Sequence, residues 1–76
     1  MKQNLKMAKV INLKVKLSKH RIMNIVTAVD PSVTPELVYS MCGVGGKIVS
    51  AEVTKEMPLF MALFESQRQQ KQLGII

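Results

Sequence analysis

The chain has 76 residues, a net charge of +6 and an apolar fraction of 47%. This length allows one small domain with a modest core, and this composition excludes a disordered polymer. No apolar run approaches the roughly 20 residues of a membrane span, and the basic start lacks the apolar stretch of a secretory signal. The single cysteine excludes an internal disulfide. We therefore expect a cytoplasmic protein with no membrane span.

The positive charge is concentrated at the start of the chain. Residues 1–21 hold seven basic residues and no acidic one, whereas the rest of the chain holds four basic and five acidic residues. This separation indicates a polyanionic partner: nucleic acid, an anionic membrane surface or an acidic protein face. The simpler alternative is a solvated, lysine-rich end that aids solubility.

Residues 10–18 alternate between apolar and polar side chains, after a segment, residues 1–7, that we expect to be a flexible arm. The two sets are Ile11, Leu13, Val15 and Leu17 on one side and Asn12, Lys14, Lys16 and Ser18 on the other. A period of two predicts a strand with one buried face and one basic face exposed to solvent.

The next segment carries a helical pattern that begins after Ser18, a residue that can cap a helix. Its apolar residues with helical spacing are Ile22, Ile25, Val26 and Val29. This spacing predicts one apolar stripe on a helix, although the β-branched residues leave a second strand as an alternative. Asp30 precedes a proline and ends the element in either case.

Two interpretations compete for residues 34–54. In the first, Thr34 caps a short helix that Gly43 ends, and a strand follows over residues 47–54. In the second, residues 37–44 and 47–54 are two strands joined by a pair of glycines, which is typical of a hairpin. We favour the first interpretation.

A C-terminal helix is predicted over residues 58–72. Its apolar stripe consists of Met57, Phe60, Met61 and Phe64. Helical spacing of this kind favours burial in the core, and we expect the polar second half to project into solvent or onto a partner, with residues 73–76 flexible. The whole chain is therefore expected to be one small α+β domain, with an N-terminal basic strand, two or three helices and a C-terminal helix.

Catalytic machinery is not expected. His20 lies in the basic run and is expected at the surface, while Cys42 lies among apolar residues and is expected in the core. No cluster of His, Cys, Asp and Glu has the close spacing of a metal site, and the glycine-rich residues 43–47 are too short for a phosphate-binding loop. We expect no enzyme activity, no metal and no cofactor.

The basic strand offers chemistry for reading DNA, because Asn12, Lys14 and Lys16 can reach base edges from a β-ribbon. The stretch INLKVKL, followed by a helix, a short loop and Thr34-Pro35-Glu36, resembles the ribbon-helix-helix repressors over residues 10–42. The resemblance implies that two chains pair their strands into a DNA-reading ribbon. It also implies that these three residues contact bases and that the backbone near Thr34 holds a phosphate.

From these features we expect a nucleic-acid-binding regulator that acts as a homodimer through the strand at 10–18. DNA is favoured over RNA, since three aromatic residues in the chain offer little for stacking single-stranded bases. The expected binding residues are Asn12, Lys14, Lys16, Lys19, Arg21 and Thr34. The alternative is a small inhibitor or adaptor that docks on an acidic face of a larger protein.

Overall fold

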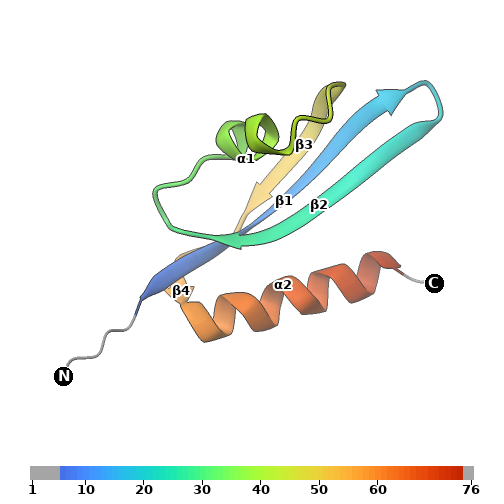
Figure 1. Cartoon of the computed structure of the whole chain (residues 1–76). Coiled ribbons are helices and arrows are strands. Elements are labelled where there is room, and N and C mark those ends of the chain that lie inside the picture. The colour runs from blue at the N-terminus through green and yellow to red at the C-terminus, as the bar shows by residue number, and fades with distance from the viewer. Residues whose placement is uncertain (1–5, 75–76) are drawn as a thin grey trace.

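The computed structural model describes residues 6–74 and consists of an antiparallel sheet with one helix on each face (Figure 1). The elements are β1 (Met7–Ser18), β2 (Arg21–Val29), α1 (Pro35–Cys42), β3 (Lys47–Val53), β4 (Met57–Pro58) and α2 (Leu59–Gly74). The strand order is β2-β1-β3, and the short β4 pairs with the first residues of β1. This is the small α+β domain that the sequence predicts.

The strand β1 runs through the centre of the sheet and supplies most of the core. On the face toward α1, Ile11, Leu13 and Val15 are fully buried and pack with Val38 of that helix. The alternation predicted that the other face is exposed to solvent along its whole length, and this is wrong. That face begins with a buried segment that α2 covers, in which Val10 packs against the helix, and it becomes exposed at Lys14 and Lys16.

The segment after Ser18 is a strand, so the predicted helix is wrong and the alternative is confirmed. β2 pairs with β1 over nearly its whole length, and Ser18 faces Arg21 across a two-residue turn. The apolar residues are mostly β-branched, which favours extended backbone over a helix. Pairing with β1 satisfies the backbone hydrogen bonds of this segment and buries Val26.

The ribbon-helix-helix arrangement is not adopted, because β1 has a neighbour on both sides. Asn12, for example, faces Val26 of β2 and Glu52 of β3. The edges through which a second chain would pair with residues 10–18 are therefore occupied. The first helix of that arrangement is also replaced by β2. In this sheet order β1 offers no free edge over residues 11–16 for pairing with a second chain.

The helix α1 and the strand β3 confirm the interpretation that we favoured for residues 34–54. The side chain of Thr34 accepts a hydrogen bond from the Leu37 amide at 3.2 Å, which caps the helix. Gly43 ends α1 with a left-handed backbone at φ 61°, a conformation that glycine adopts without steric cost. Cys42 is exposed at the end of this helix, so its predicted place in the core is wrong.

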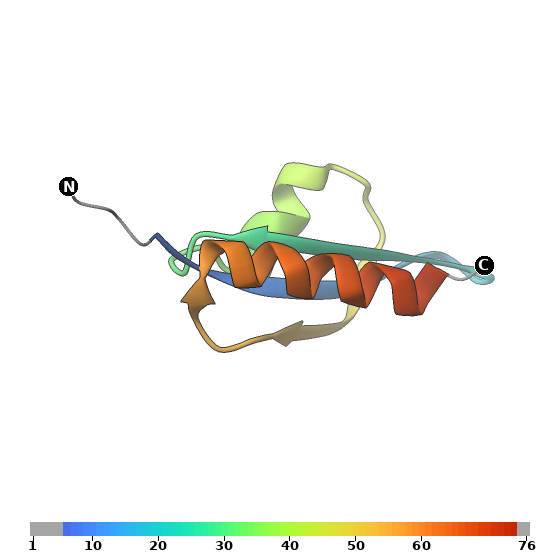
Figure 2. The same ribbon diagram turned by 90° about the horizontal axis from the view of Figure 1, so that it is seen from below.

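The helix α2 lies along β1 and β2 (Figure 2). Ala62 and Ser66 are buried against the sheet, whereas Phe60 and Phe64 are 71% and 72% exposed. The predicted orientation is therefore reversed: the apolar stripe faces away from the sheet and the polar second half contacts it.

Hydrogen bonds to the sheet account for this orientation. The Asn12 side chain donates to the Gln69 side chain at 3.0 Å and accepts from Asn24 at 2.8 Å. The Gln70 side chain donates to the backbone carbonyl of Val26 at 3.1 Å. Buried polar groups on the sheet require such partners, and the glutamines of α2 supply them.

The ends of the described chain are regular structure. Met7 begins β1 and Gly74 ends α2, so part of each terminal segment that we expected to be flexible belongs to an element. Residues 1–5 and 75–76 lie outside the described residues. Over the part that is described, neither helix has the length and apolar character that crossing a membrane requires.

Candidate nucleic-acid interface

Basic side chains gather at the end of the sheet where β1 turns into β2. Lys14 and Lys16 are exposed on the same face of β1, two residues apart. Lys47, the first residue of β3, lies directly opposite Lys16 in the adjoining strand. Directly opposed residues of an antiparallel pair project from the same face, so these two lysines are neighbours.

The hairpin turn adds further positive charge at this end. Lys19 lies in the turn itself and Arg21 begins β2, and both are exposed. We call the set Lys14, Lys16, Lys19, Arg21 and Lys47 the basic end. His20 lies in the same turn and is exposed, as predicted.

A close backbone approach places Lys47 beside Lys16. Gly46 has φ 76°, and a Cβ atom at this position would collide with the backbone carbonyl of Lys16. The Tyr39 hydroxyl donates to the Gly46 carbonyl at 2.6 Å, which ties the loop to α1. The loop between α1 and β3 therefore needs glycine at this position, and it fixes where β3 begins.

Sequence reasoning did not include Lys47 among the binding residues. The strand that it begins was predicted, but the local pattern did not say which strand would be its neighbour. The paired glycines before it marked a turn, and only the sheet order places that turn against β1.

Within the part of the chain that the structure describes, no ion pair involves the basic end. Among the described residues, the one ion pair joins Arg68 and Glu65 of α2 at 3.3 Å. Hydrogen bonds from Gln69 and Arg68 lower the pKa of Glu65. At the far end of β2, the Ser32 backbone amide and hydroxyl lower the pKa of Asp30. These two carboxylates are thus stabilised by residues outside the basic end.

Two of the predicted binding residues have other roles in the structure. Asn12 is half-buried under α2, and its amide oxygen and nitrogen are bonded to Asn24 and Gln69. Thr34 lies beyond the last residue of β2, at the other end of that strand from Arg21, and its hydroxyl caps α1. Neither joins the basic end, whereas Lys14, Lys16, Lys19 and Arg21 come together there.

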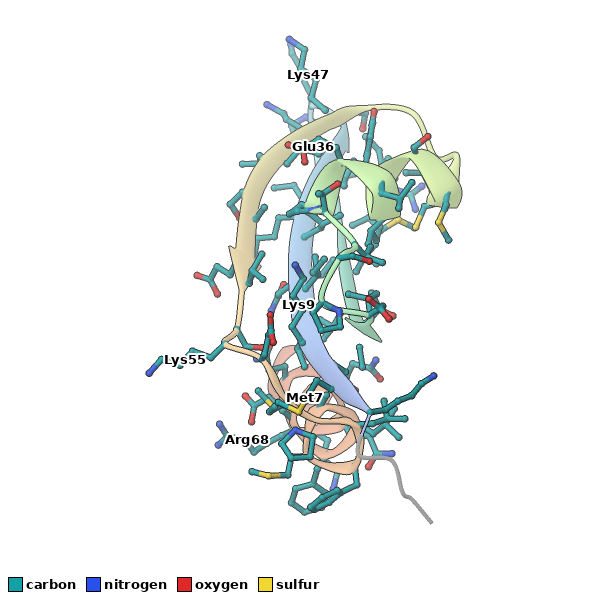
Figure 3. All side chains as sticks on the ribbon, turned by 90° about the vertical axis from the view of Figure 1, so that its left-hand side faces the viewer. Met7, Lys9, Glu36, Lys47, Lys55 and Arg68 are labelled. Carbon is teal, nitrogen blue, oxygen red and sulfur yellow. The ribbon has the colours of Figure 1, made fainter. Side chains whose placement is uncertain are left out.

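Figure 3 shows Lys47, one member of the basic end, pointing outward at the top, and Arg68 of α2 near the bottom. No group of three His, Cys, Asp or Glu side chains in the described part of the chain could hold a metal ion. No family model, curated protein or solved structure matches this chain.

Proposed function

We propose that this protein binds duplex DNA through its basic end, by contacts to the phosphate backbone. The observation that carries the proposal is the direct opposition of Lys16 and Lys47. Like charges that face each other across a strand pair destabilise a sheet. A polyanion that bridges these lysines would convert this repulsion into attraction, and the uncompensated charge of Lys14, Lys19 and Arg21 would add to it.

The chemistry of the basic end favours the backbone of a duplex over single-stranded bases. Proteins that hold single strands stack bases on exposed aromatic rings. Tyr39 is half-buried, and its hydroxyl is hydrogen-bonded to the loop before β3. Phe60 and Phe64 lie on α2 and are not part of the basic end. The lysines and arginine can instead meet phosphates and release their counterions.

This proposal revises the means of recognition that the sequence suggested. Asn12 is bonded within the fold, so the proposed base contact through its amide is withdrawn. Phosphate contacts position a protein on DNA but carry little sequence information. We therefore propose that the protein binds DNA with weak sequence preference. A regulatory role would then come from covering DNA and not from recognising a particular site.

The salt dependence of binding tests the proposal. If all five cations of the basic end meet phosphates, the logarithm of affinity should fall with the logarithm of salt at a slope of about −4 to −5. The Lys47→Ala variant should flatten this slope by about 0.9. The matched control is Lys55→Ala, which removes one charge at a place well separated from Lys47 (Figure 3) and should leave the slope unchanged.

The measurement is fluorescence anisotropy of a labelled DNA duplex titrated with the protein at several salt concentrations. Absence of binding at roughly 50 mM salt, where electrostatic association is strong, would refute the proposal and favour the inhibitor or adaptor. Tighter binding to single-stranded RNA than to duplex DNA would also contradict it. Equal losses of affinity in Lys47→Ala and Lys55→Ala would contradict it as well, because binding would then depend on the total charge and not on the basic end.

A further inference from the structure

The first two turns of α2 are apolar on nearly every side, although only one side meets the sheet. Ala62 faces the sheet and is fully buried. The opposite side carries the exposed rings of Phe60 and Phe64, and Met61 and Leu63 on the flanks are about half exposed. A helix that is apolar all round is normally buried on all sides.

We call these four exposed side chains, Phe60, Met61, Leu63 and Phe64, the outer patch. An open hollow of about 470 Å³ lies in it, lined by Met57, Phe60, Met61, Phe64 and Glu65. A surface with both projecting rings and a hollow can accept the projecting rings of a partner. Methionines at such a surface adapt their shape to what they contact.

The area of the outer patch is large for so small a protein. Each phenylalanine is more than 70% exposed, and a phenylalanine side chain can bury about 150–250 Å². With the half-exposed methionine and leucine, the patch presents on the order of 500 Å² of apolar area, which is within the range of the largest patches that monomers expose. A standard interface buries about 800 Å² per partner, and the polar residues around this patch would supply the rest.

We propose that the outer patch is the contact with a second copy of this chain, made by two α2 helices that cross antiparallel. The patch has no unpaired charge at its centre, since Glu65 is held by Arg68 at 3.3 Å and by Gln69 at 3.0 Å within the same helix. Because the patch has no unpaired charge, two copies can meet there without bringing like charges together, although the net charge of each chain is +6. A two-fold axis lets the same surface serve both copies.

The positions of the two rings along α2 suit this antiparallel arrangement. Phe60 and Phe64 lie about one turn apart on the same side of the helix. A crossing centred between them places each ring against the other one of the second copy. Arg68 lies one further turn along α2, so the same crossing leaves it at the rim of the contact, paired with Glu65 of its own helix.

A contact through the outer patch also suits the charge distribution of the protein. The exposed Lys47 lies at the end of the molecule opposite Arg68 (Figure 3), so the antiparallel contact keeps the two basic ends apart. This avoids repulsion between them. The inference does not rest on the proposed function, although a dimer with two separated basic ends would bind a long polyanion bivalently.

Analytical ultracentrifugation of the full chain tests the inference. The wild-type protein should sediment as a dimer at tens of micromolar, and Phe60→Asp/Phe64→Asp should sediment as a monomer. Both rings are largely exposed, so the variant should keep its circular-dichroism spectrum. The matched control is Met41→Asp on α1, a residue that is 75% exposed, and this variant should remain a dimer.

Three outcomes would overturn the inference as a whole. The first is a wild-type chain that stays monomeric at hundreds of micromolar. The second is dissociation by Met41→Asp with no effect of the double aspartate variant, since the contact would then lie on α1. The third is a monomer whose Phe60 and Phe64 are required to bind phosphatidylcholine vesicles, which would show that the patch meets lipid.

Discussion

The orientation of α2 gives the sharpest prediction about stability. Ala62 is fully buried and packs with Ala8, Val10 and Val26, so Ala62→Leu forces extra volume into a closed contact. Overpacking of this kind lowers the free energy of unfolding by about 1–3 kcal/mol. Phe60→Ala removes a ring that is mostly in solvent, and surface substitutions change that free energy by about 0.5 kcal/mol or less.

The measurement is urea unfolding followed by circular dichroism. For a chain of this size the dependence on urea is about 1 kcal/mol per molar, so Ala62→Leu should move the midpoint down by about 1–3 M. Association would make unfolding depend on protein concentration. The two variants and the wild type are therefore compared at the dilute end, where the midpoint no longer changes with concentration.

The reverse order of the two variants would refute this account of α2. If the apolar stripe of the helix were packed on the sheet, Phe60→Ala would remove a core ring and cost about 3–5 kcal/mol. Ala62 would then lie toward solvent, and Ala62→Leu would have little effect. Such a result would also remove the basis for the proposed dimer contact.

Two further predictions concern the loop before β3 and the pH dependence of the loop after β2. Gly46→Ala should lower the melting temperature more than Gly43→Ala. Both glycines have positive φ, but only Gly46 lies close to the backbone carbonyl of Lys16. Equal decreases in melting temperature would contradict this close approach. Hydrogen bonds from Ser32 lower the pKa of Asp30 below 3.8, so the stability that this carboxylate contributes is present above that value and is lost as the pH falls through the folded pKa. In an NMR titration the Asp30 pKa should therefore lie below 3.8 and rise in Ser32→Ala, and an unchanged pKa in the variant would refute the role of the hydroxyl.

Local signals predicted the elements whose stability is local. The alternation over residues 10–18 predicted most of β1, and the cap at Thr34 with the stop at Gly43 predicted α1. A capping side chain and a left-handed glycine act within a few residues. Their effect is therefore visible without knowledge of the rest of the fold.

The sequence did not predict features that depend on what lies next to an element. Residues 21–29 carry both helical spacing and β-branched side chains, and pairing with β1 decides between them. The stripe of Phe60 and Phe64 shows which residues share a face of α2, but periodicity does not say whether that face meets the sheet. The sequence predicted base contacts for Asn12 because its partners, Asn24 and Gln69, are distant in sequence.

The candidate site was predicted in part. The density of lysines in the first 21 residues identified four of the five members of the basic end, because two antiparallel strands bring a contiguous basic run to one place. Lys47 was missed since it joins the others only through the pairing of β3 with β1. Thr34 was included by resemblance to a fold that the chain does not have.

The most direct test of the proposed function is to map the DNA contact by NMR. Amide resonances of the isotope-labelled protein are followed while a short DNA duplex is added at low salt. We predict that the largest shifts occur at residues 14–21 and 46–48, and that they diminish as salt is raised. Shifts confined to α2, or no shifts at all, would contradict the claim that the basic end binds DNA.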